Sequence, residues 1–157
     1  MDWEQLARIV HVVCVVFWIG GVAMVTTVML PVLKEMDKDS DAFKLFHTFE
    51  KKFARQARLT TAITAISGIT MLWTTHGWSR FLEGAYWWLH AMVLIWLLFT
   101  IMLFIIEPFV LPRMITRISP TGARRVFPIM QRLHVILLIG SVIAIMGAVG
   151  GSHGMFF

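Results

Sequence analysis

Charged residues are missing from four long stretches of this chain of 157 residues. The stretches are 9–33, 59–79, 85–106 and 133–157, and none of them contains Asp, Glu, Lys or Arg. Each has at least 20 residues, which is about the length at which a helix crosses the ~30 Å hydrocarbon layer of a bilayer. With 58% hydrophobic and only 15% charged residues, the composition excludes an ordinary soluble globular protein.

Cysteines and catalytic motifs are equally scarce. Cys14 is the only cysteine, so the chain forms no disulfide within itself. The sequence contains no nucleophile elbow, no phosphate-binding loop and no H-E-x-x-H zinc motif. Carboxylates are few, and Glu107 is the only acid that adjoins the inner end of a charge-free stretch. We therefore expect any reaction to come mainly from a bound cofactor rather than from side chains.

Lysine and arginine give the chain a net charge of +5, and their positions are uneven. Twelve of the 14 lie in two segments, 34–58 and 113–132, and the other two are Arg8 and Arg80. Because Lys and Arg concentrate in the cytoplasmic loops of membrane proteins, we predict that both termini and the connection around Arg80 lie outside. The positions of the basic residues thus reflect the orientation of the chain in the membrane, and we expect no nucleic-acid partner.

Short connections between the spans predict the fold. We expect an all-α integral membrane protein, an antiparallel up-and-down four-helix transmembrane bundle with both termini outside. The spans are expected at about 9–33, 57–78, 85–107 and 130–151 of a single domain, 1–157. Its surroundings are a lipid bilayer, and its expected location is the bacterial inner membrane as a multi-pass protein.

Residues 41–57 predict a cytoplasmic helix that continues into the second span. Asp41 suits an N-cap, and Phe49 and Phe53 belong to an aromatic stripe at helical spacing. The stripe is expected on the membrane face or against the end of the bundle. Further along, small and weakly polar side chains are expected to face protein rather than lipid. They are Thr60, Thr64, Ser67, Gly68, Met71 and Thr75.

Proline and glycine predict where helices end and where they approach closely. Pro108 is expected to end the third span, and Pro128 is expected to start or kink the last helix. Gly147 and Gly151 form a GxxxG pair. Such a pair permits close helix contact, either within the bundle or between copies in a homo-oligomer.

Histidines inside the charge-free stretches are the strongest functional signal. His11 lies about one turn into the first span, and His90 lies at a similar depth in the third. Ionisable side chains within a span are costly and usually mark function. Two imidazoles at matched depth can ligate one haem iron from opposite sides. We therefore predict that His11 and His90 bind a common metal centre, haem b; the alternative for each is a hydrogen bond to a neighbouring helix.

Several neighbouring residues fit a macrocycle at this level. Gly20 and Gly21 have no side chains and so leave room beside the first span. Arg8 and Arg80 are candidates to pair with haem propionates at the outer headgroup level. Arg8 fits the role of an ordinary interfacial anchor equally well. His76, at the outer end of the second span, is a substitute metal ligand for either histidine.

His134 is expected on the cytoplasmic side, just inside the fourth span. A second haem there would need His47, or a thioether such as Met29 or Met102, as the partner of His134. Alternatively, His134 binds a quinone or makes a local hydrogen bond. The eleven methionines also invite copper as the metal, although most of them sit where any apolar side chain would fill the core.

Three short motifs stand out: H-x6-W-I-G-G in the first span, W-L-H in the third, and an arginine that leads the fourth. They comprise His11, Trp18, Gly20 and Gly21, then Trp88–His90, then Arg132. The pattern resembles the superfamily of small four-helix membrane proteins that includes the bacterial integral-membrane protoporphyrinogen oxidase and the copper-resistance D domain. The resemblance implies haem at the positions of His11 and His90, or copper handling. The oxidase pattern has a lysine where this chain has Met92, so the resemblance implies haem binding more directly than porphyrin oxidation.

The sequence therefore predicts a b-type haem protein, a cytochrome-like redox protein that transfers electrons one at a time. Its expected partners are a quinol, a periplasmic electron carrier or a porphyrin, and a haem-dependent membrane oxidoreductase is one form of this hypothesis. Two alternatives stay open. One is a membrane protein that transports or handles copper through His and Met ligands, and the other is a structural subunit of a larger membrane complex.

Overall fold

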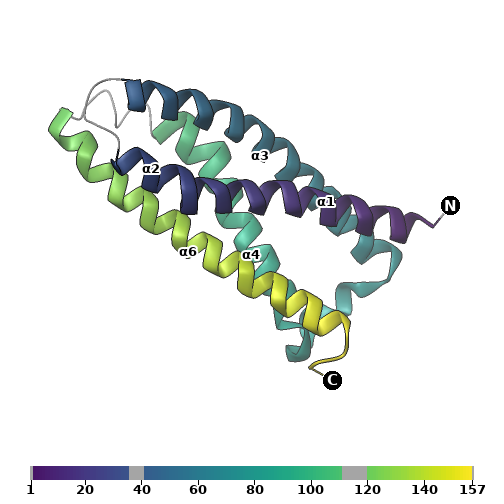
Figure 1. The fold of residues 1–157 in the computed structure, drawn as a ribbon. Helices are drawn as coiled ribbons and strands as arrows, with labels where there is room; N and C mark the ends of the chain where they lie inside the picture. The colour runs from purple at the N-terminus through teal and green to yellow at the C-terminus, as the bar shows by residue number, and fades with distance from the viewer. Residues whose placement is uncertain (1, 36–40, 111–119, 157) are drawn as a thin grey trace.

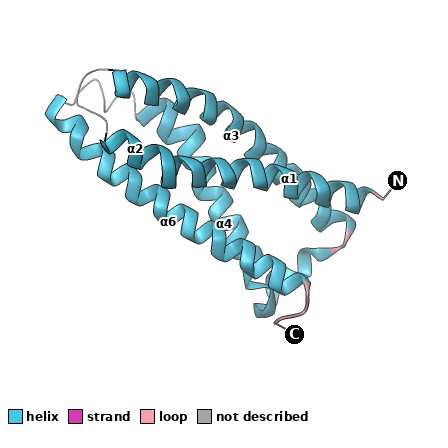
Figure 2. Cartoon of the chain, in the orientation of Figure 1, coloured by secondary structure: helices cyan, strands magenta, loops and turns pink. Residues whose placement is uncertain are grey.

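The structure, a computed structural model, describes residues 2–35, 41–110 and 120–156. Within these ranges the chain is helical apart from short turns, and it contains no strand (Figure 2). Successive long helices run in opposite directions, so that α1 begins and α6 ends toward the same end of the molecule (Figure 1). The prediction of an all-helical fold is confirmed.

The first helical segment contains a π-helix. It begins as α1 (Trp3–Met24), widens into the π-helix η1 (Val25–Met29) and continues as α2 (Leu30–Glu35). Pro31 lies just after the π-helix. A proline inside a helix lacks a donor and its ring clashes with the carbonyl four residues earlier. The wider π turn accommodates this clash without breaking the helix.

The second segment is one continuous helix, α3 (Asp41–Thr74). It begins at the predicted N-cap region and runs without a break from the charged half into the apolar half, as the sequence predicts. His76 follows in the left-handed conformation, with φ of 49°. Two short 3-10 helices, η2 (Gly77–Leu82) and η3 (Gly84–Tyr86), then lead to the third segment.

Pro108 does not end its helix, and Pro128 does not start the last one. The third segment, α4 (Trp87–Ile101), continues as the π-helix η4 (Met102–Val110), and Pro108 lies inside η4 instead of ending the helix. As at Pro31, the wider turn relieves the clash of the proline ring. The last helix, α6 (Pro120–Ser152), begins at Pro120 rather than at Pro128. Proline suits a first helical position because its missing N–H would be unpaired there.

The helices pack as two pairs, α1 with α3 and α4 with α6. The pairs meet in a core of side chains from all four helical segments. Its buried members are Trp18, Val22, Ala57, Phe99, Leu103 and Leu137. The ring of Trp18 contacts the ring of Phe99 edge to face, with centroids 5.0 Å apart and planes at 82°. Such aromatic pairs add to the free energy gained from apolar burial.

Three helical segments are long and apolar enough to cross a membrane: Trp3–Val32, Gly84–Phe109 and Gln131–Ser152. Their outer faces carry large apolar side chains that no other part of the described chain covers. Val16 and Ile136, for example, are 64% and 65% exposed. Extended apolar surface of this kind is unfavourable in water and suits the lipid of a bilayer.

The remaining predicted span, the second in the chain, lies within α3. It is not among these three because threonine and serine lower its mean hydropathy. Thr61, Thr64 and Ser67 are at most 5% exposed, and Thr60 is 9% exposed. The Ser67 hydroxyl donates to the carbonyl of Ile63, 2.7 Å away. The polar stripe of α3 therefore faces protein, as the sequence predicts, and α1 covers it.

Candidate functional site

His11 projects from α1 onto the polar stripe of α3. Its Nδ1 lies 3.0 Å from the carbonyl oxygen of Thr64 and 3.2 Å from the hydroxyl oxygen of Ser67. Because a carbonyl oxygen only accepts, Nδ1 carries the proton and donates it. In the neutral ring, Nε2 then has a free lone pair, and among the described residues Nε2 has no hydrogen-bond partner.

Unpaired polar atoms accompany His11 on the same helix pair. Trp18 Nε1, Thr61 Oγ1 and Thr64 Oγ1 are buried and lack a hydrogen-bond partner within the described part of the chain. Leaving a buried polar group unpaired costs about 1–3 kcal/mol. Such groups commonly mark a place where water or a ligand binds.

Side chains fill the space beside two of the glycines, Gly68 and Gly21. A Cβ at Gly68 would lie 3.3 Å from Cε1 of His11, so the imidazole occupies the room that this glycine leaves. Gly21 leaves room for the ring of Phe53, whereas Gly20 faces open space. Two of the gaps expected to admit a macrocycle therefore hold an imidazole and a phenyl ring.

His90 lies on the other helix pair. It is exposed on α4, and its ring meets that of Phe81 edge to face, with centroids 5.4 Å apart. The structure shows no contact between His11 and His90 within the ranges it describes. In the same ranges there is also no group of three or more His, Cys, Asp or Glu side chains that would hold a metal ion.

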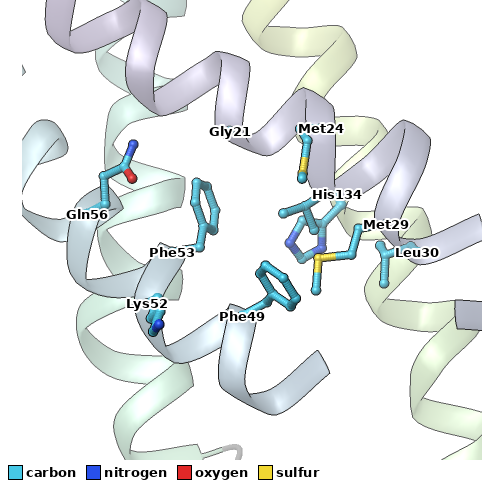
Figure 3. A pocket seen from close by; sticks show the side chains of 10 residues that line it. Gly21, Met24, Met29, Leu30, Phe49, Lys52, Phe53, Gln56 and His134 are labelled. Atoms are coloured by element: carbon cyan, nitrogen blue, oxygen red, sulfur yellow. The ribbon is translucent and has the colours of Figure 1, made fainter. Parts of the chain in front are cut away.

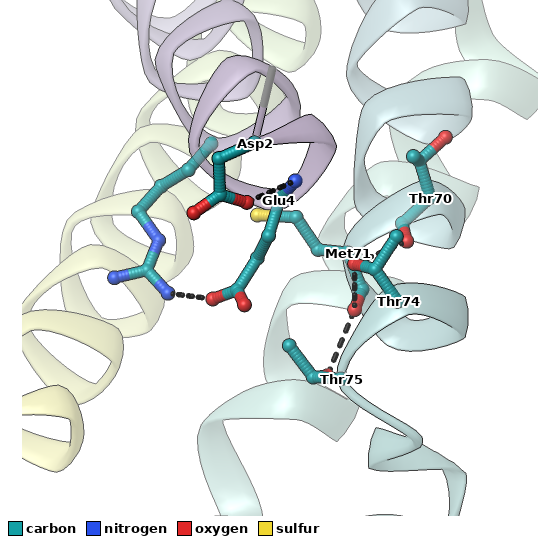
Figure 4. Close-up of polar contacts among 7 residues, drawn as sticks. Asp2, Glu4, Thr70, Met71, Thr74 and Thr75 are labelled. Atoms are coloured by element: carbon teal, nitrogen blue, oxygen red, sulfur yellow. Dashed lines mark hydrogen bonds and ion pairs between the residues drawn. The ribbon is translucent and has the colours of Figure 1, made fainter.

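The two arginines proposed for propionates each have a local partner. Arg8 donates to Glu4 one turn earlier, with 2.6 Å between Nη2 and Oε1, near the N-terminus of α1 (Figure 4). The guanidinium of Arg80 lies over the ring of Tyr86, 5.7 Å from its centroid. Both arrangements are typical of interfacial side chains, which is the alternative role that the sequence allowed for Arg8.

The remaining histidines of the outer end are exposed at helix ends. His76 follows α3 and His153 follows α6. Nδ1 of His153 lies 2.8 Å from the carbonyl oxygen of Val149. Neither histidine is shown in contact with His11. The side chain of His47 lies outside the described residues.

The end of the bundle remote from the N-terminus of α1 contains a cavity of about 300 Å³ (Figure 1). It lies between the end of α1 with the π-helix that follows it, the charged half of α3 and the middle of α6 at His134 (Figure 3). The side chains that line it include Met24, Met29, Phe49, Lys52, Phe53, Gln56 and His134. We call this space the inner cavity.

The inner cavity brings together residues that the sequence singled out separately. Met29 was one of the partners that a second haem at His134 would need, and the two residues share the cavity, whereas Met102 packs against the core. Phe53 belongs to the aromatic stripe, and the structure places it against the bundle rather than on the membrane surface. No sequence pattern marks Lys52 or Gln56, and their place beside the cavity follows only from the tertiary structure.

Glu107 also has a partner, Arg58. Its Oε1 lies 3.2 Å from Nη2 of Arg58, and Nε of Arg58 donates to the carbonyl of Leu103 at 3.0 Å. The pair joins α3 to η4 and stabilises the contact between these helices.

Comparisons of the chain with protein-family models, with curated proteins and with solved structures found no match.

Proposed function

We propose that this protein binds haem b in the membrane and transfers electrons, with His11 as a ligand of the iron. The observation that carries the proposal is the hydrogen bond from Nδ1 of His11 to the carbonyl of Thr64. A metal-bound histidine nearly always donates its second ring nitrogen to a carbonyl or carboxylate, which fixes the tautomer and makes the ligand more basic. The resemblance to haem-binding four-helix membrane proteins supports the same function.

Of the two predicted haem ligands, only His11 has contacts that fit this role. His11 has the hydrogen bonding expected of an axial ligand, and the unpaired Trp18 Nε1 lies on the same helix. His90 contacts Phe81 on the other helix pair, so no contact supports it as the second axial ligand. If His11 alone held the haem, the group would supply chemistry with a small oxidant or gas; if His11 and His90 both held it, the group would supply electron transfer. When bound, the haem supplies the redox chemistry, and the protein orients it and excludes water.

An absorption spectrum of the purified protein tests this proposal. We expect a Soret band in the wild type and its loss in His11→Ala, while the exposed His153→Ala serves as the matched control. Loss of low-spin α/β bands in His90→Ala would establish bis-histidine ligation, and their retention would establish His11 as the only histidine ligand of the pair. A colourless protein from haem-replete cells would refute haem binding.

We further propose a four-span bundle in the bacterial inner membrane with both termini outside. The support is the coverage of the polar stripe of α3 by α1, which lets α3 cross the bilayer with its apolar face toward lipid. The basic residues then gather at the inner end. Alkaline phosphatase fused after Phe157 should be active, and the same enzyme inserted after Lys38 should be inactive. The reverse activities would overturn the orientation.

Copper handling is the second candidate function. The observation in its favour is that Met24, Met29 and His134 line the same cavity, since thioether and imidazole are ligands that suit copper. Titration of the purified protein with cuprous ion tests it. We expect one ion per chain if this function holds, and loss of binding in Met24→Leu and Met29→Leu.

A further inference from the structure

We propose that the inner cavity binds the head group of a membrane quinone. Its volume is larger than an ion site requires. A volume of about 300 Å³ is roughly twenty times the space that one water-sized particle needs. It is also at the lower end of the range for sites of small organic ligands. The space therefore suits a molecule with a single substituted ring better than an ion or a macrocycle.

The lining has the chemistry that a flat ring with two carbonyls requires. Phe49 and Phe53 on one side and Met24 and Met29 on the other present apolar, polarisable surfaces (Figure 3). Aromatic rings and thioethers pack well against the face of a π system. The faces of a quinone ring would therefore lie between these side chains.

Hydrogen-bond donors occur on two different helices around the same space. Lys52 and Gln56 lie on α3, and His134 lies on α6. A quinone carries two carbonyl acceptors on opposite edges of its ring, and donors on separate helices match that arrangement. Among the described residues that line the cavity none is acidic, so a cationic ligand would find no counter-charge. Donors without acids favour a ligand with acceptor oxygens over a cation.

The position of the cavity gives a membrane-dissolved ligand access. Met24 and Phe49 are 52% and 48% exposed, so the cavity is partly open at its rim. It lies where the apolar span Trp3–Val32 approaches its end. The exposed side chains of Val28 and Val32 continue the apolar surface beside it. An isoprenoid tail would lie along this surface while the head group enters between the helices.

The wall formed by η1 points to a binding site independently of the lining chemistry. Val25 and Met29, the first and last residues of this π-helix, both face the cavity. Single π turns inside helices occur frequently at functional sites, because they shift the register of the side chains that follow. Here Met29 lines the cavity together with His134 (Figure 3). The binding proposed for this cavity requires no iron at His11, which lies toward the other end of α1.

Isothermal titration of the purified protein in detergent with ubiquinone-1 tests the proposal. We expect saturable binding of one molecule per chain, weakened at least tenfold in Lys52→Met and in His134→Ala. Lys51→Met is the matched control, since Lys51 is exposed and adjacent but does not line the cavity. Gln56→Leu is a second test at an exposed position, in case His134→Ala does not fold. Binding should persist in His11→Ala, which separates this site from the haem proposal.

Photolabelling with an azido-quinone supplies an independent location. We expect the label in the peptides that contain Met24–Met29 and Phe49–Gln56, and its loss with excess ubiquinone-1. Absence of saturable binding, equal affinity in all the cavity variants, or a label confined to other peptides would overturn the proposal. Binding of one cuprous ion without any binding of ubiquinone-1 would overturn it in favour of a copper site.

Discussion

The imidazole of His11 packs directly over the backbone of Gly68, where the absence of a side chain leaves room for it. A Cβ at this glycine would approach Cε1 of His11 to 3.3 Å and Nδ1 to 3.5 Å. The glycine thus lets the histidine reach the Thr64 carbonyl, and the two residues together fix the orientation of the ring.

Enlarging Gly68 should displace His11. We expect Gly68→Val to lower the free energy of unfolding by about 1–3 kcal/mol through overpacking and to weaken haem binding. Gly20→Ala is the control, because nothing lies within 4 Å of its Cβ position; it should be neutral or stabilising by up to about 1 kcal/mol. Thermal unfolding in detergent, followed together with the Soret band, measures both effects. Equal behaviour of the two variants would contradict the packing.

The GxxxG pair of α6 packs within the molecule. Gly147 contacts Trp87, and Gly151 contacts Trp88, each so closely that a Cβ would collide with an indole ring. We therefore expect Gly151→Leu to destabilise the fold by about 1–3 kcal/mol without changing the oligomeric state. Light scattering coupled to gel filtration, with thermal unfolding, checks this. A stable variant with altered mass would instead place the motif between copies.

The ion pair between Arg58 and Glu107 should contribute more than the one between Arg8 and Glu4. The side chains of the first pair are 35% and 21% exposed, against 65% and 36% for the second. Water screens the second pair more strongly, so we expect coupling energies of about 1–2 kcal/mol and about 0–0.5 kcal/mol respectively. A double-mutant cycle for each pair measures these coupling energies. The first cycle uses Arg58→Met and Glu107→Gln, and the second uses Arg8→Met and Glu4→Gln. Equal coupling energies would refute this ranking.

Trp18 should contribute to stability through its ring rather than through its indole N–H. The residue is 4% exposed and contacts Phe99, but Nε1 has no partner among the described residues. We expect Trp18→Ala to cost about 3–5 kcal/mol and Trp18→Phe to cost far less in the cofactor-free protein. Unfolding of both variants with and without haem checks this. A larger loss for Trp18→Phe in the haem-bound protein would show that the N–H becomes paired on binding.

Local sequence predicted most of the helical elements. The charge-free stretches predicted three of the apolar segments, because hydropathy and length are properties of consecutive residues. The helical spacing of small polar residues identified the buried face of α3, since residues three and four apart share a face. Pro108 was misread because a π turn, which depends on several hydrogen bonds at once, keeps the helix continuous through it.

The sequence by itself determined that the chain is helical, where its apolar segments lie and which histidines fall within them. Only the tertiary structure decided what those histidines touch. Whether His11 faces His90 or Thr64, and whether His134 meets Met29 or Met102, depends on how each helix is rotated and which helix it pairs with. Those quantities result from packing between residues far apart in the chain, such as Gly68 with His11 and Gly21 with Phe53. No local pattern encodes the rotation of a helix or the choice of its partner, because the sequence of a helix is the same whichever neighbouring helix it packs against.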